Sequence, residues 1–366
     1  MEIKPSGIRR FFDIANEMEN VISLSVGEPD FYTPWHIREA GIHSLEKGKT
    51  RYTPNRGLIK LREEICSFMQ RKYGVPYSAA TDTLVTVGGS EVLIPEPSFV
   101  CYEPIAQMAG GTTVIIKTKA ENNFRLTPEE LEAHITEKSK VLILPFPNNP
   151  TGAVMRKEHL EPIAKIVEKY NLFVLSDEIY SELTYGKERH VCFSSLPEMW
   201  KRTVVVNGFS KTYSMTGWRM GYACGPKEII GPMTKLHQYA IMSAPTTSQY
   251  AAIEALAHGD DDIEQMKSEY DMRRRLIVDG LNHLGLTCFE PEGAFYVFPS
   301  IQSTGLTSTE FCEQLIYSKQ VAVVPGGAFG ACGEGFVRIS YSYSIKHISE
   351  ALVRIGDFLK ELKDEQ

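Results

Sequence analysis

Residues 140–180 read KVLILPFPNNPTGAVMRKEHLEPIAKIVEKYNLFVLSDEIY and contain three structural signals in a row. An apolar run at 140–146 predicts a strand, and a second apolar run at 172–177 predicts another. Between them, residues 156–171 form an amphipathic helical pattern. Its apolar positions recur at helical spacing and are Leu160, Ile163, Ile166 and Val167. Strands that are apolar throughout and separated by a helix indicate a parallel sheet covered by helices on both faces.

The chain beyond this segment first extends the pattern and then changes it. TVVVNGFS at 203–210 predicts a further strand, and residues 261–285 predict a long charged helix. After that helix the predicted strands become shorter and the turns richer in glycine. We therefore expect an α/β protein with a three-layer large domain, built on a mostly parallel sheet over residues 46–270, and a smaller α+β domain at 271–366. The N-terminal segment 1–45 is expected to pack with the smaller domain.

The composition excludes several classes of function. The 366 residues are 43% hydrophobic and 23% charged, which is ordinary for a soluble globular protein. The net charge of −7 argues against a nucleic-acid partner. No apolar run approaches the ~20 residues that span a bilayer, and the N-terminus lacks the apolar core of a secretory signal, so we expect no membrane partner. Seven scattered cysteines without a C-x-x-C pair, and histidines without metal-ligand spacing, predict a cytoplasmic protein with reduced thiols and no metal site.

Polar residues follow the first two predicted strands at their carboxyl ends, where doubly wound sheets bind ligands. Asp177 ends the strand LFVLSD, and a carboxylate there requires a cation or hydrogen-bond donors if it is buried. Tyr180 follows three residues later. Asn149 lies in the turn after the first strand, where its amide could bind a ligand oxygen. The alternatives are an N-cap role for Asp177 and a simple Pro/Gly turn around Asn149.

Three cationic residues lie in unusual surroundings. Lys211 follows the strand at 203–210 among small, aromatic and apolar neighbours, which suggests an enclosed amine with a lowered pKa that can act as nucleophile or base. Ser210 and Arg219 could share a phosphate. Arg338 interrupts an apolar strand and requires an anion if it is buried. That anion is either a structural carboxylate or the carboxylate of a substrate.

The order of these motifs resembles the class I/II aminotransferases. The motifs are Asn-Pro-Thr-Gly, then Ser-Asp-Glu-x-Tyr after a strand, then Ser-Lys-x-x-x-x-x-Gly-x-Arg, and a late Phe-Val-Arg. The resemblance runs from SLSVGEPDF at 23–31 to the last predicted helix. It implies the aspartate aminotransferase fold (fold type I), pyridoxal 5'-phosphate as cofactor, and a transaminase that acts on an L-amino acid and a 2-oxo acid by a ping-pong mechanism.

The resemblance also implies roles around the cofactor ring. Lys211 would be the Schiff-base lysine and would carry the proton between substrate and cofactor. Asp177 would pair with the pyridine nitrogen. Tyr180 and Asn149 would hydrogen-bond the phenolic oxygen, and Phe99, in PSFVCY, would stack on the ring.

Around the phosphate, the resemblance implies a cradle with one member from a second subunit. Ser210 and Arg219 would hold the phosphate together with Ser90 and the backbone of residues 88–89, which are Gly88 and Gly89. Tyr52, in RYTPNRG, would reach the phosphate of the neighbouring subunit, which implies a homodimer.

At the substrate side, the resemblance implies that Arg338 binds the α-carboxylate, with Gly27 and Asn149 beside it. Two alternatives stay open: a carbon–sulfur β-lyase of the same fold, and a cofactor-binding homologue without activity. The donor amino acid also stays open, because similar-looking enzymes act on aspartate, aromatic amino acids or acylated diaminopimelate.

The segment 85–99, VTVGGSEVLIPEPSF, departs from the resembled family. There, the strand that ends in GGS leads into a helix that faces the phosphate, whereas here only GGSE separates two strand-like runs. Parallel strands need a crossover of about a dozen residues or more. Three interpretations are open. The two runs form a hairpin, the helix is truly deleted from the protein, or roughly fifteen to twenty residues are absent from the sequence as given. The last interpretation is the simplest, and the departure makes a cradle of Gly88, Gly89 and Ser90 doubtful.

Overall fold

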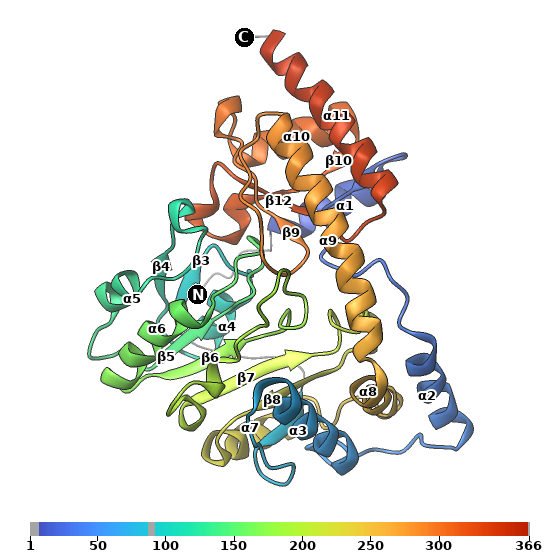
Figure 1. Cartoon of the computed structure of the whole chain (residues 1–366), viewed down its shortest axis with the longest axis vertical. Helices are drawn as coiled ribbons and strands as arrows, with labels where there is room; N and C mark the ends of the chain where they lie inside the picture. Colours follow the sequence, from blue (N-terminus) through green and yellow to red (C-terminus); the bar gives the residue numbers. More distant parts are fainter. Residues whose placement is uncertain (1–6, 87–91, 365–366) are drawn as a thin grey trace.

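A sheet of seven strands forms the centre of the larger part of the molecule (Figure 1). The computed structural model describes residues 7–86 and 92–364. The strands of this sheet are β2 (Thr83–Thr86), β3 (Leu93–Glu96), β4 (Val114–Lys117), β5 (Val141–Leu144), β6 (Phe173–Asp177), β7 (Thr203–Gly208) and β8 (Gly221–Cys224). Their spatial order is β2-β8-β7-β6-β5-β3-β4. β3 to β7 run parallel, and β8 is antiparallel to both of its neighbours, which confirms the mostly parallel sheet expected from the sequence.

Helices cover both faces of this sheet. They are α3 (Ile59–Tyr73), α4 (Tyr102–Met108), α5 (Pro128–His134), α6 (Lys157–Lys169), α7 (Lys227–Ala240) and α8 (Thr246–His258). Leu142 and Leu144 of β5 belong to the same apolar cluster as Ile163 of α6. Ile143, which lies between them in sequence, packs on the opposite face with Tyr102 of α4. This alternation places the sheet in the middle of three layers.

The smaller part combines the C-terminal region with an N-terminal strand. Its elements are β1 (Ile22–Ser23), β9 (Tyr296–Val297), α10 (Ser308–Lys319), β10 (Val321–Ala322), β11 (Val324–Pro325), β12 (Val337–Ser340) and α11 (Ile345–Asp364). β11, β12 and β9 form an antiparallel sheet in that order, and β1 pairs in parallel with β10. The long helix α9 (Asp260–His283) runs between the two parts in Figure 1.

The N-terminal segment contacts both parts. Phe11 of α1 (Gly7–Glu17) packs in the apolar cluster of the smaller part. Ile37 of α2 (Trp35–Glu46) packs instead with Ala251 of α8 in the larger part. The limits of the two domains stay a prediction.

The hairpin interpretation of residues 85–99 is wrong. β2 pairs with β8, whereas β3 pairs with β4 and β5, so four strands lie between them. Glycine-rich turns between short strands look alike in sequence whether or not the flanking strands pair with each other. Gly88, Gly89 and Ser90 lie outside the described residues.

Candidate active site

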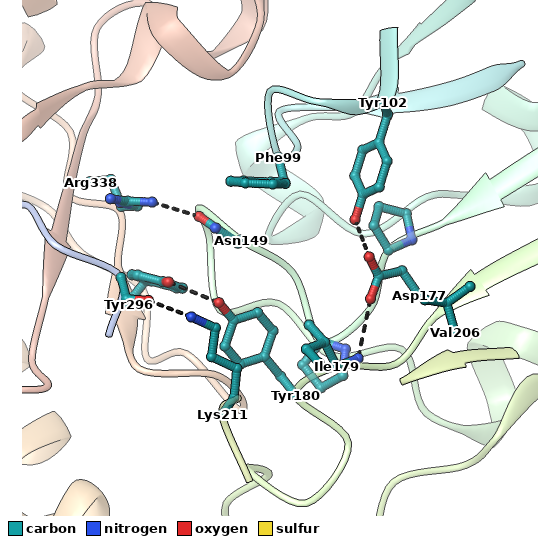
Figure 2. A pocket seen from close by; sticks show the side chains of 13 residues that line it. Phe99, Tyr102, Asn149, Asp177, Ile179, Tyr180, Val206, Lys211, Tyr296 and Arg338 are labelled. Carbon is teal, nitrogen blue, oxygen red and sulfur yellow. Dashed lines mark hydrogen bonds between the residues drawn. The ribbon is translucent and has the colours of Figure 1, made fainter. Parts of the chain in front are cut away.

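A pocket with a cavity volume of about 330 Å³ opens where the carboxyl ends of β5, β6 and β7 meet the smaller part. Figure 2 shows Arg338 and Tyr296 on one side of it and Asp177 on the other, with Lys211 and Tyr180 between them. The pocket therefore has walls from both parts of the molecule. This is the edge at which the sequence predicts a ligand site.

Asp177 ends β6 and forms one wall of the pocket. One carboxylate oxygen accepts a hydrogen bond of 2.7 Å from the Tyr102 hydroxyl, and the other accepts one of 3.2 Å from the Ile179 backbone N–H. Burial raises the pKa of this carboxyl group. The helix-capping alternative is wrong, because residues 178–192 are all described and contain no helix.

Lys211 lies on the loop after β7, and its amine is enclosed. Nζ donates a 2.5 Å hydrogen bond to the backbone oxygen of Gly27 and lies 5.8 Å from the centre of the Phe295 ring. Burial lowers the pKa of the amine to about 8. At pH 7 roughly a tenth of this amine is then neutral, far more than for an ordinary lysine, and only the neutral amine acts as a nucleophile or base.

Arg338 of β12 is only 2% exposed and has no carboxylate partner among the described residues. It donates to Asn149 Oδ1 at 3.0 Å and to the backbone oxygen of Ser25 at 2.6 Å. Its Nε has no hydrogen-bond partner in the described part of the chain. The guanidinium lies between the rings of Tyr296 and Phe329, at 4.7 and 4.9 Å. A buried cation in this state is ready to bind an anion that enters the pocket.

Gly27 approaches the pocket so closely that no side chain fits there. A Cβ added to it would lie 2.3 Å from the hydroxyl oxygen of Tyr296. The absence of a side chain lets the Gly27 carbonyl reach Lys211 and leaves the space before Arg338 open.

The remaining predicted residues lie less clearly at the pocket. Phe99 lines the pocket and is 40% exposed, so its ring is accessible to a ligand. Ser210 precedes Lys211, and Arg219 is exposed and donates to the backbone oxygen of Thr216 at 2.8 Å. Neither of these two residues lines the pocket, and Tyr52 is 81% exposed and does not line it either.

Sequence reasoning missed Tyr102 and Tyr296, which both line the pocket. A short helix begins at Tyr102, three residues after Phe99. This spacing could have indicated that the two rings lie near each other. Tyr296 reaches the site because β9 pairs with β12, which places Tyr296 opposite Ser340. No pattern within one segment of the sequence reveals such a pairing.

An enclosed lysine with a lowered pKa, and a half-buried carboxylate and a buried arginine that both lack a counter-ion among the described residues, on this α/β fold, fit a pyridoxal-phosphate-dependent enzyme. Residues 19–355 match the family "Aminotransferase class I and II". The chain belongs to this family and is a transaminase.

Named relatives agree with this assignment. The chain is 49% identical to "Putative aminotransferase YugH" of Bacillus subtilis, over 98% of this chain and 96% of the relative. It is 44% identical to an aspartate aminotransferase of Pyrococcus abyssi, over 99% of this chain and 97% of that protein. The crystal structure of an aromatic aminotransferase from Pyrococcus horikoshii OT3 superimposes with a TM-score of 0.92 at 44% identity, covering 96% of this chain and 99% of that one.

The residues present fit the cofactor of this family. A protonated pyridine nitrogen would supply the cation that the Asp177 carboxylate lacks, since its present partners are the neutral donors Tyr102 and Ile179. Lys211 is placed for the aldehyde, and the exposed face of Phe99 for the ring.

Proposed function

We propose that this transaminase moves the amino group of an L-amino acid to a 2-oxo acid in two half-reactions, with ping-pong kinetics. The observation that carries the proposal is the position of the Lys211 amine, which lies in the pocket between the Asp177 wall and Arg338. The first oxo acid leaves before the second one binds. The net change is an exchange of an amino group and a hydrogen for a carbonyl oxygen.

Pyridoxal phosphate supplies an aldehyde that reacts with amines and a ring that withdraws electrons from the substrate Cα. Asp177 keeps a proton on the ring nitrogen, because a buried carboxylate is best satisfied by a cation. Tyr180 and Asn149, which line the pocket, would hold the phenolic oxygen, and Phe99 would cover one face of the ring.

Arg338 and Lys211 have different roles toward the substrate. Arg338 binds the α-carboxylate and fixes which bond of Cα faces the ring, which is a positioning role. Lys211 would accept the proton from the substrate Cα and hold it for the return step. The lowered pKa of its amine supports this role, since only the neutral amine accepts a proton.

We also propose that the active unit is a homodimer in the cytoplasm. Tyr52, Tyr32 and Tyr239 expose more than 80% of their surfaces, and Leu236 exposes 73%. These large exposed side chains are available for contact with a second copy of the chain. Ser210, Arg219, Gly88, Gly89 and Ser90 would hold the phosphate, with Tyr52 of the second subunit. None of the described helices is long and apolar enough to cross a bilayer.

An absorption spectrum tests the proposed function. Purified protein with added pyridoxal phosphate should show a visible band, and a mixture of amino acids should convert it to the band of the aminated cofactor. The Lys211→Ala variant should show neither change. Absence of the band from the wild-type protein at saturating cofactor would contradict the proposal. Release of pyruvate and ammonia without an oxo-acid acceptor would identify a β-lyase instead.

A further inference from the structure

The hydroxyl groups of Tyr180 and Tyr296 form an isolated pair beside the pocket. Their oxygens lie 2.8 Å apart, and the two residues are 4% and 1% exposed. Within the described residues, neither hydroxyl has another hydrogen-bond partner. Each phenol has one proton, so one hydroxyl donates to the other and the second keeps its proton available for a ligand.

The charges around the pair favour Tyr296 as the donor. The guanidinium carbon of Arg338 lies 4.7 Å from the centre of the Tyr296 ring, and its charge makes the hydroxyl groups of both tyrosines more acidic. The carboxylate of Asp177 opposes ionisation of Tyr180. Burial raises the pKa of both phenols, and that of Tyr180 further, so both are neutral and Tyr296 is the stronger donor. The other nearby charge, on Lys211, lies in the same pocket.

The proton of Tyr180 is then free to point into the pocket. If Tyr180 accepts from Tyr296, its own O–H has no acceptor within the described part of the chain. Figure 2 shows Tyr180 next to Lys211 at the place where the cofactor ring is proposed to lie. An oxygen anion of that ring would be the missing acceptor.

We propose that Tyr296 is a positioning residue that acts through two separable parts. Its hydroxyl donates to Tyr180 and so directs the Tyr180 proton to the phenolic oxygen of the cofactor. Its ring, with that of Phe329, holds the Arg338 guanidinium in place for the substrate carboxylate. This inference rests on the proposed function, which assigns Tyr180 to the phenolic oxygen.

The hydroxyl role is tested by Tyr296→Phe, which removes one oxygen and keeps the ring. Without the bond from Tyr296, Tyr180 can rotate, and the negative phenolic oxygen loses stabilisation. The nitrogen that joins Lys211 to the cofactor then holds its proton more tightly. We expect the pH midpoint of the visible band, measured without substrate, to rise by about 1 unit.

Two further variants make this test specific. Tyr185→Phe also removes a buried hydroxyl, which donates to the Ala294 backbone oxygen outside the pocket, so its midpoint should equal that of the wild type. Tyr180→Phe should raise the midpoint at least as far as Tyr296→Phe, and the double variant should add nothing to Tyr180→Phe. An unchanged midpoint in Tyr296→Phe, or an equal rise in Tyr185→Phe, would overturn the hydroxyl role. Absence of any visible band in the wild type would refute the proposed function itself.

The ring role is tested by steady-state kinetics. Tyr296→Phe should leave the KM for the donor amino acid within about twofold of wild type, because the ring over Arg338 remains. Tyr296→Leu removes the ring, and we expect its KM to rise about tenfold. Equal KM values for the two variants would overturn this part of the proposal.

Discussion

At the scale of single residues, the most informative value in the site is the lowered pKa of Lys211. Only a neutral amine attacks an aldehyde, so protonation limits the reaction below the pKa of the amine. Burial lowers that pKa to about 8. An ordinary lysine would have a pKa of about 10.4.

We therefore expect the rate of pyridoxal phosphate attachment to cofactor-free protein to rise with pH and to level off above about pH 8. Stopped-flow absorbance between pH 6.5 and 10 measures this rate. Free Nα-acetyl-lysine serves as the control, and its rate should still be rising at pH 10. A rate for the protein that also keeps rising to pH 10 would contradict an enclosed amine with a lowered pKa.

Replacing Arg338 should lower the activity far more than the stability. Its charge is buried with no counter-ion in the described chain. Removing the arginine therefore also removes the free-energy cost of burying an unpaired charge. For Arg338→Met we expect the free energy of unfolding of cofactor-free protein to stay within about 1 kcal/mol of wild type. The kcat/KM should fall by roughly 10²- to 10³-fold, since charge-assisted hydrogen bonds to the substrate are lost.

A matched control for Arg338 is Arg273, which is also buried but has a carboxylate partner. Arg273 contacts both oxygens of Asp30, at 2.7 and 2.8 Å. Asp30 itself is exposed, so Arg273→Met leaves a hydrated carboxylate behind and loses the paired, charge-assisted hydrogen bonds, which should destabilise by about 2 kcal/mol. Urea denaturation compares the two variants. If Arg338→Met were as destabilising as Arg273→Met, the unpaired state of Arg338 would be disproved.

At the scale of elements, Glu292 connects the loop before β9 to the larger part. Its carboxylate contacts Arg125 and accepts from Arg156, at the start of α6, at 2.6 and 2.9 Å. Its backbone N–H donates to the Gly152 oxygen at 3.1 Å. These contacts hold the strand that carries Tyr296 against the turn that carries Asn149.

We expect Glu292→Ala to lower the free energy of unfolding by about 1 to 2 kcal/mol, because two arginines lose a shared partner. The control is Glu188→Ala, which removes a mostly exposed carboxylate 3.3 Å from the same Arg156. That variant should change stability by less than about 0.5 kcal/mol. Chemical denaturation of both proteins in low salt measures the difference, and equal values would argue against a connection between the parts through Glu292.

The secondary-structure elements also show which parts of the fold could be predicted from the sequence. The strands at 141–144 and 173–177 were predictable because parallel strands covered on both faces are apolar at every position. Asp177, Asn149 and Lys211 were predictable because Asp177 ends such a strand and the other two lie in the loops that follow one.

The errors arose where partners are distant in sequence. β2 and β3 are close in the chain but belong to different places in the sheet, and a glycine-rich turn carries no information about that. The β2–β3 connection remains short for two parallel strands separated in this way. The alignment with the Pyrococcus abyssi relative extends over 378 residues against 366 in this chain, so at least twelve aligned positions have no counterpart here.

Tyr296 was also missed because its partners are distant in sequence. It reaches Arg338 only through the pairing of β9 with β12.

At the scale of the whole molecule, the exposed aromatic side chains predict the state of assembly. We expect a mass in solution of about 82 kDa, twice the chain mass of 41.1 kDa. Analytical ultracentrifugation measures it. Tyr239→Asp places a charge on a residue that is 88% exposed, and it should shift the protein toward monomer if Tyr239 is covered by the second copy. A fully active wild-type monomer would refute the homodimer and the role of Tyr52 across an interface.

The pocket has walls from two separate regions of the chain, and this arrangement has a consequence for how such an enzyme can diverge. Lys211 and Asp177 belong to the larger part, whereas Arg338 and Tyr296 belong to the smaller part, and Gly27 lies four residues after the N-terminal strand β1 that pairs with it. Substitutions around Arg338 act on how the substrate carboxylate is held, while Lys211 and Asp177 stay unchanged. Changes in carboxylate binding and changes in proton transfer can therefore arise in different stretches of one gene.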